Sequence, residues 1–179
     1  MVSDLYLGSC VDAETDGQPN GLAVTDDNTT GTNVRGTCTS NDDEDGVNLV
    51  TPLIPGGQAC LAVTAKVPGA GTAALNGWID FNGDGDFAGD ANEQLTFTSI
   101  GGVSVSTTDG TVPNGSSNQQ YCFDVPATAT FNGGDTHMRF RLSSSGGLSF
   151  SGVAANGEVE DYYTQLSCVG NFLWMDSGT

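Results

Sequence analysis

Residues 59–67 of the chain read Ala-Cys-Leu-Ala-Val-Thr-Ala-Lys-Val, with an apolar side chain at every second position. This period of two is typical of a β-strand with one face in a core, because successive side chains of a strand point to opposite sides. Further alternating runs, divided by glycine, proline and asparagine, occupy residues 77–81, 94–98, 102–106, 121–125 and 137–143. The pattern predicts an all-β fold, an antiparallel β-sandwich of the jelly-roll or Ig-like kind.

The first 46 residues are polar and acidic and show almost no apolar period, so we expect long acidic N-terminal loops. We place one β-sandwich domain at residues 1–166. A linker, or the first strand of a following or neighbouring module, then occupies residues 167–179. The chain opens with Met1-Val2-Ser3-Asp4 and shows no basic and apolar leader, so we expect a processed chain or a piece of a longer protein.

The charge balance excludes several classes of function. The 179 residues hold 22 Asp and Glu against 4 Lys and Arg, a formal net charge of −18. Nucleic-acid binding and attachment to an anionic membrane both need basic residues, and no apolar run is long enough to insert into a bilayer. Leu, Ile, Val and Phe make up about a fifth of the chain, which is close to the composition of disordered proteins. We therefore expect bound cations and disulfides to add to the stability of a small core.

The five cysteines lie far apart and form no CxxC pair, which removes the usual spacing of zinc, haem and thioredoxin-type sites. With few lysines and many Thr, Ser, Asn and Gly residues, they favour a secreted protein at the cell surface, where disulfides persist. We prefer the pairs Cys10–Cys38 and Cys60–Cys122 and leave Cys168 single, and the sequence leaves other pairings open.

The sharpest local motif is Asp80-Phe81-Asn82-Gly83-Asp84-Gly85-Asp86. Oxygen-bearing side chains at alternate positions converge on one cation when the backbone wraps around it, and Gly85 stands at the sixth place, where an EF-hand loop turns sharply. Hard oxygen ligands in a flexible loop favour Ca²⁺. An EF-hand would have its last glutamate at Ala91, so here Asp90 or Glu93 is expected to close the site. The candidate ligands are Asp80, Asn82, Asp84, Asp86, Asp90 and Glu93, and the alternative is an ordinary turn without an ion.

A second acidic set is dispersed along the chain. Neighbouring carboxylates repel one another unless a cation or solvent lies between them, so this set is either a second cation site or a solvated acidic face. Strand periodicity places Glu158 and Glu160 on one face and Val159 on the other. The candidate ligands here are Asp12, Glu14, Asp26, Asp27, Asp43, Asp45, Glu158 and Glu160.

Catalysis receives little support. Paired carboxylates invite comparison with a glycosidase, but these acids stand in Gly-rich loops beside other acids, without the sequence signature of an apolar pocket. His137 is expected to be a strand-face side chain, because no GxSxG motif or activated cysteine accompanies it. Arg139 and Arg141 share its face and are expected to pair with acids. We expect Trp78 and Tyr121 to be core or sheet-face aromatics rather than a platform for sugar binding.

Several motifs together resemble the GEVED domain of secreted and surface-anchored bacterial proteins. They are Gly157-Glu158-Val159-Glu160-Asp161-Tyr162, the preceding residues 139–143, the loop at residues 77–87, and the upstream residues 7–14 and 42–47. The resemblance implies a non-catalytic β-sandwich module of large surface proteins and adhesins, and it favours the dispersed acids as a real second calcium site. Residues 169–176 look like the opening strand of an Sdr-type B repeat, a calcium-binding surface module.

We therefore expect a non-catalytic, calcium-stabilised structural or adhesion module, with Ca²⁺ as its cofactor. Its expected partners are neighbouring modules of the same or identical chains and, as an alternative, surface glycans or proteins bound by Trp78, Tyr121, Tyr162 or Tyr163. A self-assembling filament subunit that uses its C-terminal strand is a further alternative, since an exposed strand with Phe172 and Trp174 would favour association.

Overall fold

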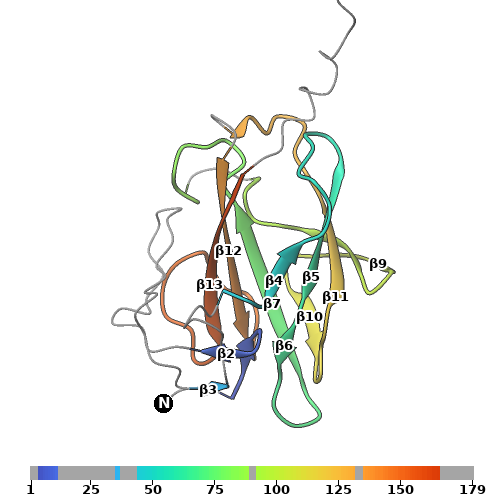
Figure 1. The fold of residues 1–179 in the computed structure, drawn as a ribbon, viewed down its shortest axis with the longest axis vertical. Coiled ribbons are helices and arrows are strands. Elements are labelled where there is room, and N and C mark those ends of the chain that lie inside the picture. The colour runs from blue at the N-terminus through green and yellow to red at the C-terminus, as the bar shows by residue number, and fades with distance from the viewer. Residues whose placement is uncertain (1–3, 12–34, 37–43, 89–91, 132–134, 166–179) are drawn as a thin grey trace, which may run out of the picture.

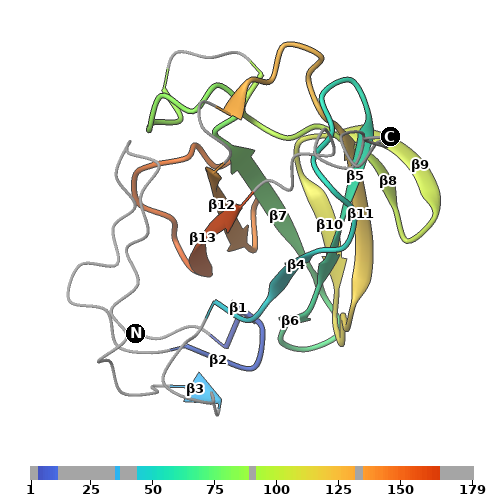
Figure 2. The same cartoon turned by 45° about the horizontal axis from the view of Figure 1, so that its top comes forward.

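The computed structural model describes residues 4–11, 35–36, 44–88, 92–131 and 135–165. It is all-β and has the predicted sandwich-like arrangement, with two sheets facing each other (Figures 1 and 2). All strand pairings among these residues are antiparallel. The N-terminal acidic segments at 12–34 and 37–43, and the predicted linker at 167–179, lie outside the described residues.

One layer is a four-stranded sheet and the other a five-stranded sheet. The first has the strand order β10 (Gly110–Pro113), β7 (Thr72–Ile79), β12 (Asp135–Ser143) and β13 (Glu158–Gln165). The second has the order β4 (Val47–Leu49), β5 (Gln58–Val63), β11 (Gln119–Asp124), β8 (Phe97–Ile100) and β9 (Val103–Thr107). Two small pairs join β1 (Tyr6–Leu7) to β6 (Ala65–Lys66), and β2 (Cys10–Val11) to β3 (Arg35–Gly36).

The core lies between the two sheets and follows the period of two along each strand. On β5, β7, β11 and β12 the core side chains stand at alternate positions, as Ala59, Leu61 and Val63 do on β5. Its largest fully buried side chains are Tyr121, Phe97, Phe123 and Phe140. The run expected at residues 94–98 differs in one respect, because β8 begins only at Phe97. Leu95, two residues before β8, is buried in the same core. The alternation at residues 94–98 therefore predicted the buried side chains correctly but placed the start of the strand too early.

The N-terminal segment contributes to the core, which the sequence did not predict. Leu5 and Leu7 are buried at 3% and 0% exposure, and Leu7 lies opposite Ala65 in the β1–β6 pair. Two backbone hydrogen bonds add to this contact, from Gly8 N to Thr64 O and from Thr64 N to Gly46 O, each 2.8 Å long. A two-residue strand is too short for a periodic signal, so only tertiary contacts define it.

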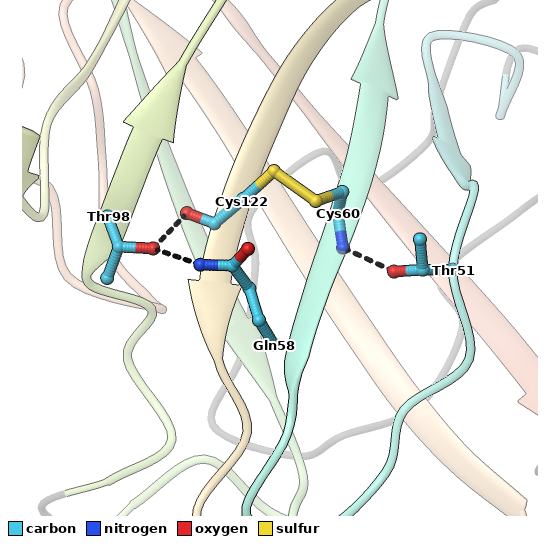
Figure 3. The surroundings of a disulfide bond; sticks show 5 residues. All are labelled: Thr51, Gln58, Cys60, Thr98 and Cys122. Atoms are coloured by element: carbon cyan, nitrogen blue, oxygen red, sulfur yellow. Dashed lines mark hydrogen bonds between the residues drawn. A yellow bond between two sulfur atoms is a disulfide. The ribbon is translucent and has the colours of Figure 1, made fainter. Parts of the chain in front are cut away.

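The predicted Cys60–Cys122 disulfide is present, and its two residues lie directly opposite each other on β5 and β11, with Cα atoms 4.0 Å apart (Figure 3). The neighbours of the disulfide are polar: Cys60 N donates to Thr51 Oγ1 at 2.7 Å, and Thr98 Oγ1 donates to Cys122 O at 3.3 Å. Cys10 is also disulfide-bonded. Its predicted partner Cys38 and the predicted odd residue, Cys168, lie outside the described residues.

A smaller apolar cluster covers the outer face of the four-stranded sheet. Trp78 and Phe87 are each 3% exposed, and Leu148 and Phe150 pack against them. The rings of Phe87 and Phe150 lie 6.4 Å apart between centroids. This cluster joins the segment after β7 to the connection between β12 and β13.

Candidate metal centre

The loop that follows β7 is fixed to the sheet at its first residue. Asp80 N donates to His137 O at 3.0 Å, and Thr136 Oγ1 donates to Asp80 O at 2.6 Å, so β12 holds the start of the loop. Gly83 and Gly85 have φ angles of 74° and 88°. This left-handed region strains residues that carry a Cβ atom, which explains why glycine stands at both turns of the loop.

The loop folds around the Asp80 carboxylate. This side chain is 2% exposed, and it accepts hydrogen bonds from Gly83 N at 2.6 Å and from Gly85 N at 3.0 Å. The two backbone donors hold the carboxylate in one orientation, so Asp80 is a fixed oxygen donor at the centre of the loop.

The next alternate residues continue the same turn pattern. Asn82 Nδ2 donates to Asp84 Oδ2 at 2.9 Å, and Asp84 N donates to Asn82 Oδ1 at 2.8 Å. Asp86 N donates to Asp84 Oδ1 at 3.2 Å, and Asp86 Oδ1 in turn accepts from Ala88 N at 2.6 Å. In an Asx turn, an Asn or Asp side chain accepts a hydrogen bond from the backbone N–H two residues later, as these side chains do. The spacing of these residues thus shapes the loop, whether or not each one binds an ion.

Glu93 reaches the same place from the other end of the loop. The chain returns along the edge of β7, where Ile79 N donates to Glu93 O at 3.0 Å and Trp78 forms a bridge with Gln94. This pairing places Glu93 beside Asp80, and its side chain is 1% exposed. Carboxylate oxygens of Asp80, Asp84 and Glu93 all lie within 4.8 Å of one another.

This cluster fits a hard divalent cation. Three carboxylates so close together repel one another, and a cation between them removes that repulsion. Two of the arginines are engaged elsewhere, since Arg139 binds Asp161 and Arg141 binds backbone carbonyls. Oxygen donors in a glycine-containing loop suit Ca²⁺ better than a transition metal. Asp80, Asp84 and Glu93 are the residues that would hold it, and Asn82 and Asp86 shape the loop around them.

The Glu158 and Glu160 side chains hold the N-terminal segment. Glu158 Oε2 accepts a hydrogen bond from Leu7 N, and Glu160 Oε1 accepts one from Gly46 N at 3.0 Å. Asp45 lies beside them and accepts from Ser9 N at 2.8 Å. Three of the predicted second-site acids are thus brought to one end of the sandwich, where they bind backbone N–H groups.

Tyr162 completes this junction, a role that the sequence analysis did not assign. Its hydroxyl donates to Glu160 Oε2 at 2.8 Å and accepts from Val47 N at 2.9 Å. Burial raises the pKa of Tyr162, and the nearby Glu160 carboxylate raises it further. The motif residues Glu158, Glu160 and Tyr162 therefore connect β13 to the chain segments at residues 4–11 and 44–49.

The remaining predicted ligands lie outside the described residues. They are Asp12, Glu14, Asp26, Asp27, Asp43 and Asp90. In the part of the chain that the structure describes, Asp80, Asp84 and Glu93 are the single group of three or more metal-type side chains.

One of the two expected arginine–acid pairs is confirmed. Arg139 Nε and Nη2 donate to the two carboxylate oxygens of Asp161 at 2.6 and 2.5 Å, and both side chains are buried. The prediction for Arg141 is wrong. Its guanidinium donates to the carbonyls of Ser149, Ser151 and Gly152, because the 144–157 connection folds over β12 and brings backbone acceptors to it.

The aromatic residues considered for a sugar platform are mostly buried. Trp78 is 3% exposed and Tyr121 is 0% exposed, which confirms the expectation that they are core or sheet-face residues. Tyr163 is 52% exposed and its ring lies 5.0 Å from that of His137 on β12. Among the described residues no helix is long and apolar enough to cross a membrane.

A comparison with family models finds one match, the GEVED domain, over residues 74–165. This range begins in β7 and ends with β13, so it includes the loop at residues 80–88, Glu93 and the Arg139–Asp161 pair. No curated protein matches the chain. No solved structure matches it either.

Proposed function

The chain belongs to the GEVED domain family, and from that premise we propose that it is a calcium-stabilised structural and adhesion module of a large secreted bacterial surface protein. In this role it binds and spaces other modules and does not catalyse a reaction. The observation that supports the proposal best is the meeting of Asp80, Asp84 and Glu93 within 4.8 Å.

Calcium would act on the stability of the fold. Bound Ca²⁺ would supply positive charge between the three carboxylates, which would supply its oxygen ligands. Asp80 is bound to β12 and Glu93 to the edge of β7 by hydrogen bonds. A cation bound by both carboxylates would therefore connect the two ends of the loop next to one sheet. A ligand that binds the folded state alone stabilises it by mass action, by about 2.7 kcal/mol at a hundred times its Kd.

A second calcium site is part of the same proposal. Asp45, Glu158 and Glu160 each bind a backbone N–H group at one end of the sandwich, and the acids at residues 12–14, 26–27 and 43 precede Asp45 in the chain. A carboxylate oxygen can accept a hydrogen bond and bind a cation at the same time, so these N–H bonds are compatible with a bound ion. Calcium there would connect the acidic N-terminal loops to β13.

The location and the surroundings of the module follow from similar reasoning. The Cys60–Cys122 and Cys10 disulfides support a secreted protein, because such bonds persist in oxidising compartments. Residues 167–179, of which 169–176 resemble the opening strand of an Sdr-type B repeat, would lead into a following module. Neighbouring modules are then the first partners, and glycans or proteins of other surfaces the second.

The experiment that tests the proposal is calorimetric unfolding of the full chain in calcium and in chelator, with metal analysis of the protein as purified. We expect one or two bound calcium ions and a melting temperature several degrees lower in chelator, with faster proteolysis. Magnesium at the same concentration is the matched control and should restore less of the stability. An identical melting temperature in all three buffers would reject the calcium-stabilised module.

A further inference from the structure

The outermost strand of the five-stranded sheet has an open edge. Strand β9 pairs with β8 alone among the described strands, and the hairpin projects from the body of the sandwich (Figures 1 and 2). The two strands are joined by Gly101 and Gly102, whose φ angles of 56° and 81° are those of a tight hairpin turn. The strand at the facing edge of the other sheet, β10, contacts β8, so β9 extends past it.

The free backbone groups of this edge follow from the hairpin register. Val103 faces Ile100 across the two-residue turn, and hydrogen-bonding groups alternate sides along a strand. Ser104 lies opposite Ser99 at the next position, so its N–H and C=O groups point away from β8. The register shift comes after this pair, and the burial alternation of β9 gives Ser106 the same orientation as Ser104. Side chains of Ser104 and Ser106 are exposed, whereas Val105 packs partly against the core.

The charge pattern distinguishes this edge from the rest of the chain. Residues 97–108 contain no charged side chain, although the whole chain carries a net charge of −18. Natural sheet edges are commonly protected by lysine, proline or an inward charge, and β9 has none of these. Its protection is its short length and the register shift between Phe97 and Ser99. Two copies of so acidic a chain meet with least repulsion at an uncharged edge.

The sequence of β9 is complementary to itself. If two β9 strands pair antiparallel about Val105, Ser104 of each copy faces Ser106 of the other, and Val103 faces Thr107. Hydroxyl pairs and β-branched pairs are favourable across antiparallel strands. The outward groups of Ser104 and Ser106 then form the hydrogen-bonded pairs, and Val105 forms the close, non-hydrogen-bonded pair on the two-fold axis.

We propose that β9 is a docking edge for a second copy of this chain, and that two copies pair there to form one continuous sheet. The pairing depends on the described strand alone, so it is independent of calcium binding. Two five-residue strands bury less than the roughly 1,200–2,000 Å² of a stable interface. Association is therefore weak in dilute solution and strong when copies are held side by side, because tethering raises the effective concentration.

Cysteine trapping in the full chain tests the register, with Cys168 replaced by serine in every variant. The proposed pairing brings the two copies of residue 105 as close as Cys60 and Cys122, whose Cα atoms are 4.0 Å apart in this structure. The two copies of residue 104 are too far apart to bridge, since they face residue 106 and not each other. Under mild oxidation we expect Val105→Cys to form a covalent dimer about ten times faster than Ser104→Cys.

Random collisions give the opposite order, because Ser104 is the more exposed of the two residues. Equal rates, or faster dimerisation of Ser104→Cys, would overturn the proposal. Analytical ultracentrifugation of the wild-type chain at high concentration provides a second measurement. We expect a concentration-dependent dimer that is lost in Ser104→Lys, while Asn48→Lys on the opposite edge strand β4 keeps it, and a strictly monomeric wild type would also overturn the proposal.

Discussion

Replacing Glu93 with glutamine should stabilise the metal-free protein and weaken its response to calcium. Glu93 is 1% exposed, and its carboxylate lies within 4.8 Å of those of Asp80 and Asp84. Glutamine has the same shape and keeps one oxygen donor, but it carries no charge. The substitution therefore separates the electrostatic role of Glu93 from its packing.

The size of the effect follows from the distance between the charges. The buried Asp80 and Glu93 carboxylates, within 4.8 Å of each other, repel by about 3 kcal/mol at an effective dielectric constant of about 20. The exposed Asp84 carboxylate adds less, because solvent screens its charge. Burying the new amide costs about 1 kcal/mol, which leaves about 2 kcal/mol of net stabilisation without calcium. For a chain of this length that is a rise in Tm of about 4–8 °C.

Calcium stabilises the wild type more than it stabilises Glu93→Gln. At a concentration a hundred times the wild-type Kd, the ion stabilises the wild type by about 2.7 kcal/mol. If the lost charge raises the Kd a hundredfold, the same concentration stabilises Glu93→Gln by about 0.4 kcal/mol. The calcium-dependent rise in Tm thus shrinks several-fold, while the Tm in chelator increases.

Calorimetry of both proteins in calcium and in chelator measures all four values. The matched control is Asp124→Asn, which removes one negative charge at the exposed end of β11, in the sheet that does not carry the loop. It should leave the calcium response unchanged. A Glu93→Gln protein that is destabilised in chelator and still shows the full calcium response would refute the reasoning, because Glu93 would then be a packing residue.

Three further predictions concern the fold around the site. Burial raises the pKa of Tyr162. The neutral hydroxyl therefore stabilises the fold fully below the unfolded pKa of about 10, and this contribution is lost as the pH rises above it. Urea unfolding at increasing pH should show a steeper fall in the free energy of unfolding for the wild type than for Tyr162→Phe. Replacing Cys60 and Cys122 together by alanine opens a loop of 62 residues and should lower the free energy of unfolding by about 4 kcal/mol, with a wild-type value retained if the bond has no structural role. Arg139→Ala leaves the Asp161 carboxylate buried without its cation and should cost about 3–5 kcal/mol, against less than about 1 kcal/mol for Lys66→Ala on the exposed surface.

The sequence determined the fold class because strand burial repeats every two residues. The runs at 59–67 and 121–125 both have alternating apolar side chains, and their strands are neighbours in the sheet. That alternation also placed Cys60 and Cys122 on the face opposite the core, where they pair. The loop after β7 was also predictable from the sequence, because Asp80 binds Gly83 and Gly85, which are only three and five residues away.

Features that depend on distant segments were not visible in the same way. The choice of Glu93 as a third carboxylate depends on a backbone bridge to β7, and a spacing rule taken from EF-hands points to Ala91 instead. Arg141 was expected to pair with an acid, but it donates to carbonyl oxygens of the connection between β12 and β13. A strand as short as β1 carries no period at all.

The sequence by itself therefore determined what repeats along the chain or acts within a few residues: the strands, the acidic loop and the motif Gly157–Tyr162. Only the tertiary structure decided which distant groups meet. Glu160 reaches Gly46 across 114 residues, and Tyr162 reaches Val47 across 115. The physical reason is that such contacts depend on the packing of two sheets against each other, and no local preference of the chain encodes the distance between them.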